Sequence, residues 1–221
     1  GKSWVIGETL ITGIGQGYTQ TTPLQLCQMT AQLANGGFKI YPKIIVEENS
    51  KTAEDIKIII NENRNKLNEK NSGLVDTTEL LDFLIKKEHE PLFEDAKNIK
   101  LVREAMFAST NEPRGTSYSS RIEDPKYQFA GKTGTSQVKR ITKKDRELDL
   151  KTFEIPYNER DHALYIAFGP YKNPSYALSI VIEHGGSGSS AAAPIANKLF
   201  KLIIDRHELR EKARIQKTIK I

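Results

Sequence analysis

Cysteine is almost absent from this sequence, and long apolar runs are absent altogether. Cys27 is the single cysteine among 221 residues, so an intramolecular disulfide is impossible and a cysteine-based metal cluster is not expected. No stretch approaches the ~20 apolar residues of a membrane-spanning helix, and no signal peptide is visible. Because the chain opens Gly1-Lys2-Ser3-Trp4 without a methionine, we expect any signal or anchor to lie in a segment upstream.

A strong excess of charge of one sign is lacking too. The 33 lysines and arginines against 28 acidic residues leave a formal net charge of +5, which is modest and dispersed. No Lys/Arg stripe is interleaved with aromatic residues, so nucleic acid is not an expected partner. With 38% hydrophobic and 28% charged residues, the composition indicates one compact, rather polar globular domain or most of a larger one.

The clearest helix signal lies near the amino-terminal end. Thr22 suits an N-cap, Pro23 suits the first helical position, and Gln25 completes a capping box. A broad apolar stripe follows, and Asn35-Gly36-Gly37 supplies a left-handed stop. Before this helix, the glycines between residues 13 and 17 indicate a loop.

Further segments are predicted from periodicity and composition. Residues 46–74 are rich in Lys, Asn, Glu and Ile, which indicates a solvated insertion. Helices are expected at 79–85, 98–110 and 192–205. A charged helical tail is expected to follow over 207–221, which leaves residues 1–206 as the main folded part.

The remaining pattern is that of a sheet. Residues 127–138 alternate loosely, whereas 163–168 and 176–183 are compact runs rich in strand-forming residues. A turn at 172–175 joins the last two, which predicts adjacent antiparallel strands. Residues 140–160 form a polar connection longer than ordinary loops. The expected fold class is therefore α+β, with an antiparallel sheet flanked by helices.

The segment that carries chemistry is Lys132-Thr133-Gly134-Thr135. Glycine weakens a strand and often marks a close approach of another backbone. Lys132 is expected to present its ammonium on one face of the strand, while Thr133 and Thr135 share the opposite face. Thr135 can also offer its backbone N–H to a carbonyl oxygen. These groups suit an extended peptide that ends in a carboxylate and lies along a sheet edge.

Lys-Thr-Gly is also the third signature of penicillin-binding proteins and serine β-lactamases. Further segments, in order, strengthen the resemblance: Trp4, Gly7-Glu8-Thr9-Leu10, Gly13-Ile14-Gly15-Gln16-Gly17, Thr22-Pro23-Leu24-Gln25, Asn35-Gly36-Gly37, Gly115-Thr116, Arg160-Asp161-His162-Ala163, Ala167-Phe168-Gly169-Pro170-Tyr171, Glu183-His184-Gly185-Gly186-Ser187-Gly188 and Ala192-Ala193-Pro194. Together they resemble the carboxy-terminal part of the transpeptidase domain of class B penicillin-binding proteins, especially the penicillin-binding protein 2 group. The resemblance implies a partial serine β-lactamase-like fold.

The resemblance also implies roles for individual residues. Lys132 is expected in the catalytic charge network, and Thr133 and Thr135 are expected to hold the substrate carboxylate. The Thr135 N–H is expected to be one oxyanion donor, and Gly131 and Gly134 to let the substrate backbone approach. No cofactor is implied. His162 and His184 are interpreted as structural, because no metal-ligand spacing surrounds them.

Two other segments match family motifs only literally. Ser136-Gln137-Val138-Lys139 has the Ser-x-x-Lys form, but on a strand its serine and lysine point to opposite faces and share no proton. Ser109-Thr110-Asn111 has the Ser-x-Asn form, but it lies at a predicted helix end too close to Lys132. The resemblance implies that both genuine motifs, including the nucleophilic serine, lie upstream of Trp4. We expect this chain alone to be inactive and poorly stable.

The resemblance implies a D,D-transpeptidase that acts on peptidoglycan stem peptides through an acyl-serine intermediate and also binds β-lactams. It further implies an upstream anchor in the bacterial cytoplasmic membrane, a catalytic domain on the periplasmic or outer face, and the cell-elongation machinery as a possible partner. A serine β-lactamase or sensor of the same fold is one alternative. A non-catalytic remnant or interaction module is another, and covalent penicillin labelling separates it from the enzymes.

Overall fold

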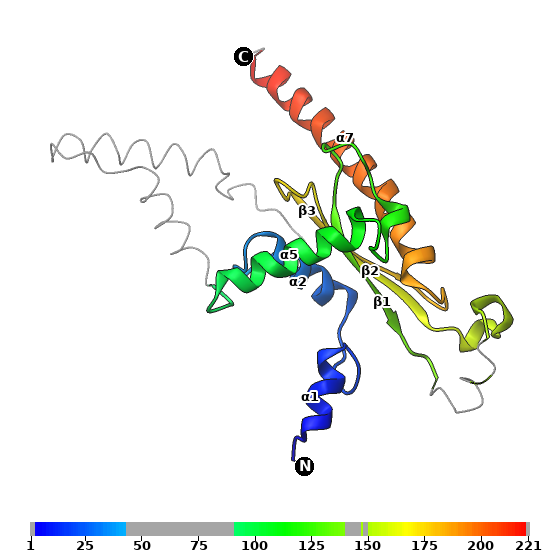
Figure 1. Ribbon diagram of the computed structural model, residues 1–221. Helices are drawn as coiled ribbons and strands as arrows, with labels where there is room; N and C mark the ends of the chain where they lie inside the picture. Colours follow the sequence, from blue (N-terminus) through cyan, green and yellow to red (C-terminus); the bar gives the residue numbers. More distant parts are fainter. Residues whose placement is uncertain (1–2, 43–90, 140–146, 148–149, 220–221) are drawn as a thin grey trace. The chain divides into compact units, whose positions relative to one another are not determined.

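A computed structural model describes residues 3–42, 91–139, 147 and 150–219 (Figure 1). The chain divides into two compact units, one formed by Gly1–Gly36 with Asp95–Ile221 and the other by Gly37–Glu94. Within the second unit, Phe38 pairs with Pro91 in an isolated antiparallel bridge. The expected insertion at 46–74 and the expected helix at 79–85 lie outside the described residues.

The first unit is built on an antiparallel sheet of three described strands. They are β1 (Ala130–Ser136), β2 (His162–Gly169) and β3 (Tyr176–Ile182), in the order β1-β2-β3. The predicted antiparallel pairing of β2 with β3 is confirmed, with Ala163 opposite Ile182. β1 pairs with β2 only, so its other edge faces no further strand among the described residues.

The helix at the amino-terminal end has the predicted caps. α2 (Pro23–Ala34) begins after Thr22, whose hydroxyl accepts from the Gln25 N–H at 3.2 Å. The Gln25 side chain accepts in return from the Thr22 N–H at 2.8 Å, which completes the capping box. Gly36 and Gly37 follow with φ of 96° and 94°, a left-handed conformation that costs glycine little.

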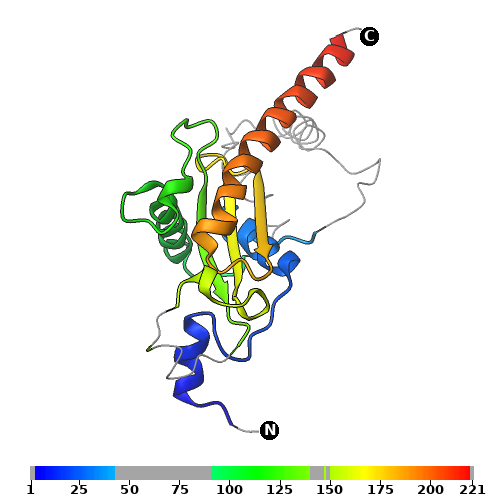
Figure 2. The same ribbon diagram turned by 90° about the vertical axis from the view of Figure 1, so that its right-hand side faces the viewer.

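Helices cover both faces of the sheet (Figures 1 and 2). On one face α2 and α5 (Ala96–Asn111) lie against Ala130 and Phe168, with Ala34 and Met106 buried in the contact. On the other face α7 (Ala193–Ile219) buries residues that include Phe200. The alternation of side chains along each strand supplies both cores. The α+β class with a helix-flanked antiparallel sheet is thus confirmed.

Two helices differ from the expectation. α1 (Ile6–Gly13) precedes the glycine loop, has no buried residue and was not predicted. α7 is one helix across the predicted boundary at 206/207, because the Lys-, Glu- and Arg-rich tail favours helix and continues it without a break. None of the described helices is long and apolar enough to cross a membrane.

The connections also contain short helices. The long 140–160 connection holds two 3-10 helices, η2 (Thr152–Glu154) and η3 (Tyr157–Glu159), among its described residues. The 3-10 helix η1 (Tyr118–Ser120) lies between α5 and β1, and a short π-helix, η4 (Gly188–Ala192), precedes α7.

Candidate functional site

The Lys-Thr-Gly segment lies on the edge strand β1. In the ladder Lys132 is opposite Ile166, whereas Thr133 is opposite Tyr165 and Thr135 is opposite Ala163. Residues directly opposite each other in an antiparallel pair share a face. The lysine side chain therefore projects from the face of the sheet that α2 and α5 cover. Both threonine side chains project from the face that α7 covers, as the alternation along the strand predicts.

The backbone of this segment faces the open edge at alternate residues. The Gly131 N–H donates outward to Thr110 Oγ1 at 3.0 Å, so Gly131 does not use its N–H for the ladder with β2. In an antiparallel ladder the residues that face away from the partner recur every second position. The N–H groups of Thr133 and Thr135 consequently point to the same edge, where an extended ligand can accept from them.

The side chain of Lys132 folds back so that its ammonium lies at the open edge of β1. Lys132 Nζ donates to the Thr133 carbonyl oxygen at 2.8 Å and lies 3.4 Å from Thr133 Oγ1. Lys132 and Thr135 are exposed, and Thr133 is half-buried. One positive charge, two hydroxyls and outward N–H groups are thus gathered along the edge of β1. This set of donors suits an anionic, extended ligand.

A buried cluster of hydroxyls, which sequence reasoning missed, lies behind the strand. Tyr165 OH is 3.0 Å from both Thr110 Oγ1 and Ser117 Oγ, and all three residues are buried. Burial raises the pKa of Tyr165, while its hydrogen bonds with Ser117 and Thr110 partly offset that shift. The tyrosine hydroxyl stays neutral and can both donate and accept in this cluster.

The same cluster changes the interpretation of Gly131. A Cβ at this residue would overlap the Tyr165 hydroxyl, and Gly131 itself is buried. The close approach at this glycine is therefore made by a tyrosine of the same chain, not by the substrate backbone we expected. Gly134 is half-buried, and a Cβ there would meet only Leu164 Cβ, at 3.4 Å.

Neither literal motif match forms a catalytic pair. Ser109-Thr110-Asn111 ends α5, as predicted, and Asn111 Nδ2 donates to the carbonyl of Phe129 at 2.9 Å just before β1. Ser136 is the last residue of β1, and Lys139 beyond it binds Glu159 Oε2 through its Nζ at 2.6 Å. The segment Ser109–Asn111, at the end of α5, thus stabilises the Lys-Thr-Gly strand through hydrogen bonds to its backbone.

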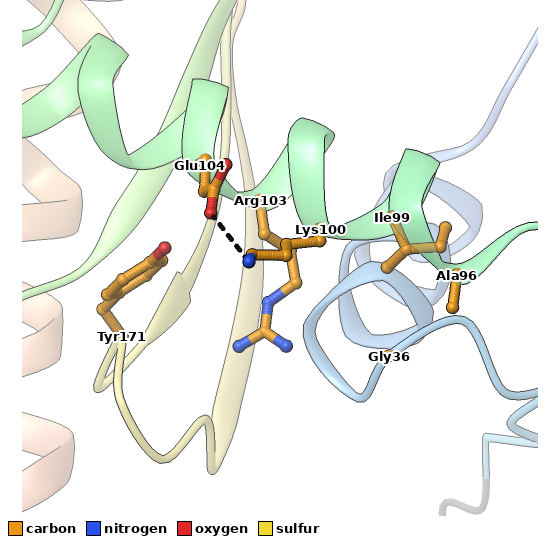
Figure 3. A pocket seen from close by; sticks show the side chains of 7 residues that line it. All are labelled: Gly36, Ala96, Ile99, Lys100, Arg103, Glu104 and Tyr171. Carbon is orange, nitrogen blue, oxygen red and sulfur yellow. Dashed lines mark ion pairs between the residues drawn. The ribbon is translucent and has the colours of Figure 1, made fainter.

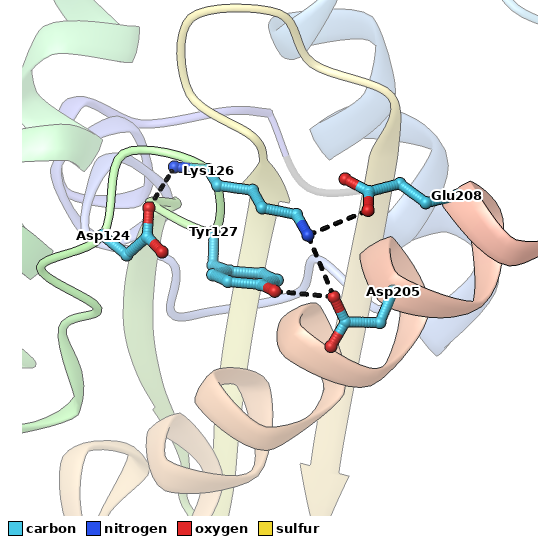
Figure 4. A network of polar contacts seen from close by, with 5 residues as sticks. All are labelled: Asp124, Lys126, Tyr127, Asp205 and Glu208. Atoms are coloured by element: carbon cyan, nitrogen blue, oxygen red, sulfur yellow. Dashed lines mark hydrogen bonds and ion pairs between the residues drawn. The ribbon is translucent and has the colours of Figure 1, made fainter.

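The segment that leads into β1 is tied to the last helix (Figure 4). Lys126 Nζ lies 3.2 Å from Asp205 Oδ1 and 2.9 Å from Glu208 Oε2. Tyr127 OH donates to the same oxygen of Asp205 at 2.6 Å. The hydrogen bond from Tyr127 and that from Lys126 lower the pKa of Asp205. Four side chains therefore connect the segment before β1 to α7.

The histidines have structural partners. His162 Nδ1 accepts from the backbone N–H of His184 at 2.9 Å, and the ring of His184 contacts the Arg160 carbonyl at 3.0 Å through Nδ1. Across the described part of the chain, no group of three His, Cys, Asp or Glu side chains is placed to hold a metal ion.

A small pocket lies away from the Lys-Thr-Gly edge, beside α5 (Figure 3). Its volume of about 230 Å³ is below the roughly 300–1,000 Å³ of small-molecule sites. Arg103 places its guanidinium over the Phe168 ring at 5.6 Å, and Lys100 pairs with Glu104 at 3.9 Å. With its lining charges already engaged and no residue of β1 among its walls, this pocket is not the candidate site.

Comparison with known proteins decides the family. The family model described as "Penicillin binding protein transpeptidase domain" matches residues 1–201. The chain belongs to this transpeptidase family. Among curated relatives in the transpeptidase family, the peptidoglycan D,D-transpeptidase MrdA of Salmonella typhimurium (strain LT2) is 35% identical over 205 residues, which are 92% of this chain and 28% of that protein. MrdA of Escherichia coli K12 is 29% identical over 206 residues, which cover 92% of this chain and 27% of the relative.

Solved transpeptidase structures agree with the fold. The chain matches PBP2 of Helicobacter pylori, in a complex with MreC, with a TM-score of 0.60 and 26% identity over 91% of this chain and 29% of the other. It matches Pseudomonas aeruginosa PBP2, in complex with WCK 5153, with a TM-score of 0.56 and 30% identity over 90% of this chain and 34% of the other. The predicted partial penicillin-binding fold of the PBP2 group is confirmed. The chain spans about a third or less of the length of these relatives.

Proposed function

We propose that this chain is part of a peptidoglycan D,D-transpeptidase, in which it supplies the strand that binds the substrate's terminal carboxylate. One observation carries the proposal. Lys132, Thr133 and Thr135 gather an ammonium, two hydroxyls and outward N–H groups along the edge of β1. The names of the curated relatives, peptidoglycan D,D-transpeptidases, support this choice among the activities of the family.

In the proposed reaction a serine attacks the carbonyl of the stem peptide and forms an acyl-serine ester, and the peptide's terminal residue leaves as an amine. An amine of a second stem peptide then takes the acyl group and frees the serine. The Thr135 N–H stabilises the oxyanion in both steps, while the hydroxyls of Thr133 and Thr135 bind the carboxylate. Lys132 contributes its positive charge beside both groups.

The serine and its lysine partner are proposed to lie in a segment that precedes Trp4. The relatives' greater length supports this, since the chain spans 28% of the Salmonella protein. The oxyanion donor and the carboxylate site have no nucleophile to assist in this chain alone. The chain by itself is therefore expected not to react with β-lactams.

Location and partners are proposed on the same basis. The complete protein is placed in the bacterial cytoplasmic membrane through an anchor outside this chain, with the catalytic domain on the periplasmic or outer face. Its ligands are stem peptides and β-lactams. The complex of Helicobacter pylori PBP2 with MreC supports a protein of the cell-elongation machinery as a partner.

Covalent labelling with a fluorescent penicillin tests the proposal. The chain is expressed alone and joined to the polypeptide encoded immediately upstream in its own gene. We expect no labelled band for the chain alone and a labelled band for the joined protein. Thr133→Val and Thr135→Val each remove a protein hydroxyl that binds the ligand's carboxylate. The second-order acylation rate constant should therefore fall by about 10- to 100-fold.

The matched control is Ser136→Ala, which removes a third hydroxyl from the same strand. Ser136 is exposed at the end of β1 and has no role in the proposed site, so this variant should acylate like the unaltered protein. Acylation at the unaltered rate in the Thr133→Val and Thr135→Val double variant would sink the proposed role of β1.

A further inference from the structure

A hydroxyl outside the Lys-Thr-Gly segment lies next to the candidate carboxylate site. Thr116 Oγ1 is 3.3 Å from Thr133 Oγ1, and Ser109 Oγ is 3.2 Å from Thr116 Oγ1. Thr116 is exposed, and the three hydroxyls form a row that starts at the end of α5 and reaches the edge of β1. Their order along the row is Ser109, Thr116, Thr133.

The backbone around Thr116 is held on both sides. Before it, a Cβ at Gly115 would lie 2.6 Å from the Ala108 carbonyl oxygen, so only glycine lets the chain pass so close to α5. After it, the Ser117 N–H donates to the Ser109 carbonyl at 3.0 Å, and Ser117 Oγ joins the buried cluster at Tyr165. Thr116 is thus set in place before any ligand arrives, a condition for precise binding.

One order of hydrogen bonds along the row leaves a proton for a ligand. Each hydroxyl has one proton and can also accept. When Ser109 donates to Thr116, the Thr116 proton points toward Thr133, and the Thr133 proton remains for a ligand. A carboxylate oxygen beside Thr133 offers several lone pairs, so the Thr116 proton can turn to it as well. Lys132, 3.4 Å from Thr133 Oγ1, supplies charge at the same point.

From this geometry we infer that Thr116 is a further substrate-binding residue, which donates a hydrogen bond to the terminal carboxylate together with Thr133. The inference rests on the proposed function, because it names an additional donor of the same site. Ser109 is a positioning residue that acts through Thr116.

The test compares a penicillin that has its free carboxylate with the methyl ester of the same penicillin. Acylation of the complete protein, in which this chain is joined to its upstream segment, is measured for both compounds. In Thr116→Val, a change of similar shape without the hydroxyl, we expect the rate constant for the acid to fall about five- to tenfold and that for the ester to stay unchanged. Thr116→Ser keeps a hydroxyl and should restore most of the lost rate.

The acid and ester pair separates a binding role from a structural one. If Thr116 only supported the fold, both compounds would acylate more slowly in Thr116→Val; such a result, or an unchanged rate for the acid, overturns the inference. If the unaltered protein reacts equally with acid and ester, carboxylate binding at β1 itself is wrong, and the proposed function fails with the inference. A loss at Thr133→Val without one at Thr116→Val refutes only the role of Thr116.

Discussion

The phenol group of Tyr165 occupies the space beside Gly131 that a side chain would otherwise fill. Tyr165 reaches this position from β2, and its ring crosses β1 to the hydroxyls of Thr110 and Ser117. The residue that precedes Lys132 is therefore fixed by hydrogen bonds to Thr110 on one side and by contact with the tyrosine on another. The neighbouring part of β1, which presents Lys132 and Thr133, is held in place by the same contacts.

Gly131→Ala should destabilise the fold. The added methyl group overlaps the Tyr165 hydroxyl, and the ring cannot move without losing two hydrogen bonds, so overpacking of about 1–3 kcal/mol is expected. A urea titration of the chain joined to its upstream polypeptide, followed by circular dichroism, measures the change, because the chain alone is expected to be poorly stable. Gly134→Ala is the control in the same strand, since its methyl group meets only Leu164 Cβ at an ordinary 3.4 Å. Equal stability of the two variants would contradict this account of Gly131.

The parts of the structure that depend on neighbouring residues could be predicted from the sequence. Two confirmed predictions involve short sequence separations: the capping box of Thr22 and Gln25, and the antiparallel pairing of β2 with β3 across a short turn. The Lys-Thr-Gly strand was found through its resemblance to a known motif. Tyr165 was missed because its partner Thr110 is 55 residues away, and only the folded sheet brings the two hydroxyls together.

The other differences have separate physical reasons. The helix α1 is short and contains two glycines and two threonines, which are weak helix formers, so its sequence did not indicate a helix. The end of α7 was predicted as a charged helical tail, and it is helical, but it continues α7 without a break because such residues extend a helix readily. Thr116 was noted only as part of Gly115-Thr116, because nothing in the sequence places it beside Thr133.

The free energy of unfolding should fall at alkaline pH, in part because of Tyr165. Burial raises the pKa of this hydroxyl in the folded state, whereas an unfolded tyrosine ionises near pH 10. Above about pH 10 the unfolded state has thus lost a proton that the folded state retains. Stability declines there by up to about 1.4 kcal/mol per pH unit for this one group.

The variant Tyr165→Phe isolates that contribution. It should be less stable at neutral pH by about 1–3 kcal/mol, because the buried hydroxyls of Thr110 and Ser117 lose a partner. Its stability should also decline less steeply above pH 10 in matched urea titrations. Tyr171→Phe, which removes the hydroxyl of a half-buried tyrosine that packs against Phe107, is the control for the loss of a tyrosine hydroxyl. Parallel pH curves for the unaltered chain and Tyr165→Phe would refute the assignment.

Asn111→Ala should loosen the entry to β1. The Asn111 side chain donates to the carbonyls of Phe107 and Phe129 at 3.1 and 2.9 Å, and the second bond joins α5 to the strand. Its loss should cost about 0.5–1.5 kcal/mol, and hydrogen exchange of the amides in β1 should become faster. Glu112→Ala, an exposed change at the next residue, is the control and should leave this exchange unchanged. Unchanged protection in Asn111→Ala would show that the ladder with β2 and the buried hydroxyl cluster hold the strand without this bond.

The connection between α7 and the segment before β1 should weaken in acid. Tyr127 and Lys126 hold the pKa of Asp205 below its ordinary value, so the ionised carboxylate is favoured in the folded state. This contribution is present above the unfolded pKa, near 3.9, and is lost as the pH falls through the folded value. The amides of Tyr127 and of α7 around Asp205 should therefore become less protected from hydrogen exchange, corrected for intrinsic rates, below about pH 4.

Asp205→Asn should show the reduced protection already at neutral pH, whereas Glu211→Gln, an exposed change further along α7, should not. Protection that is identical in Asp205→Asn and the unaltered chain would mean that apolar packing around Phe200 fixes α7 without these four polar side chains.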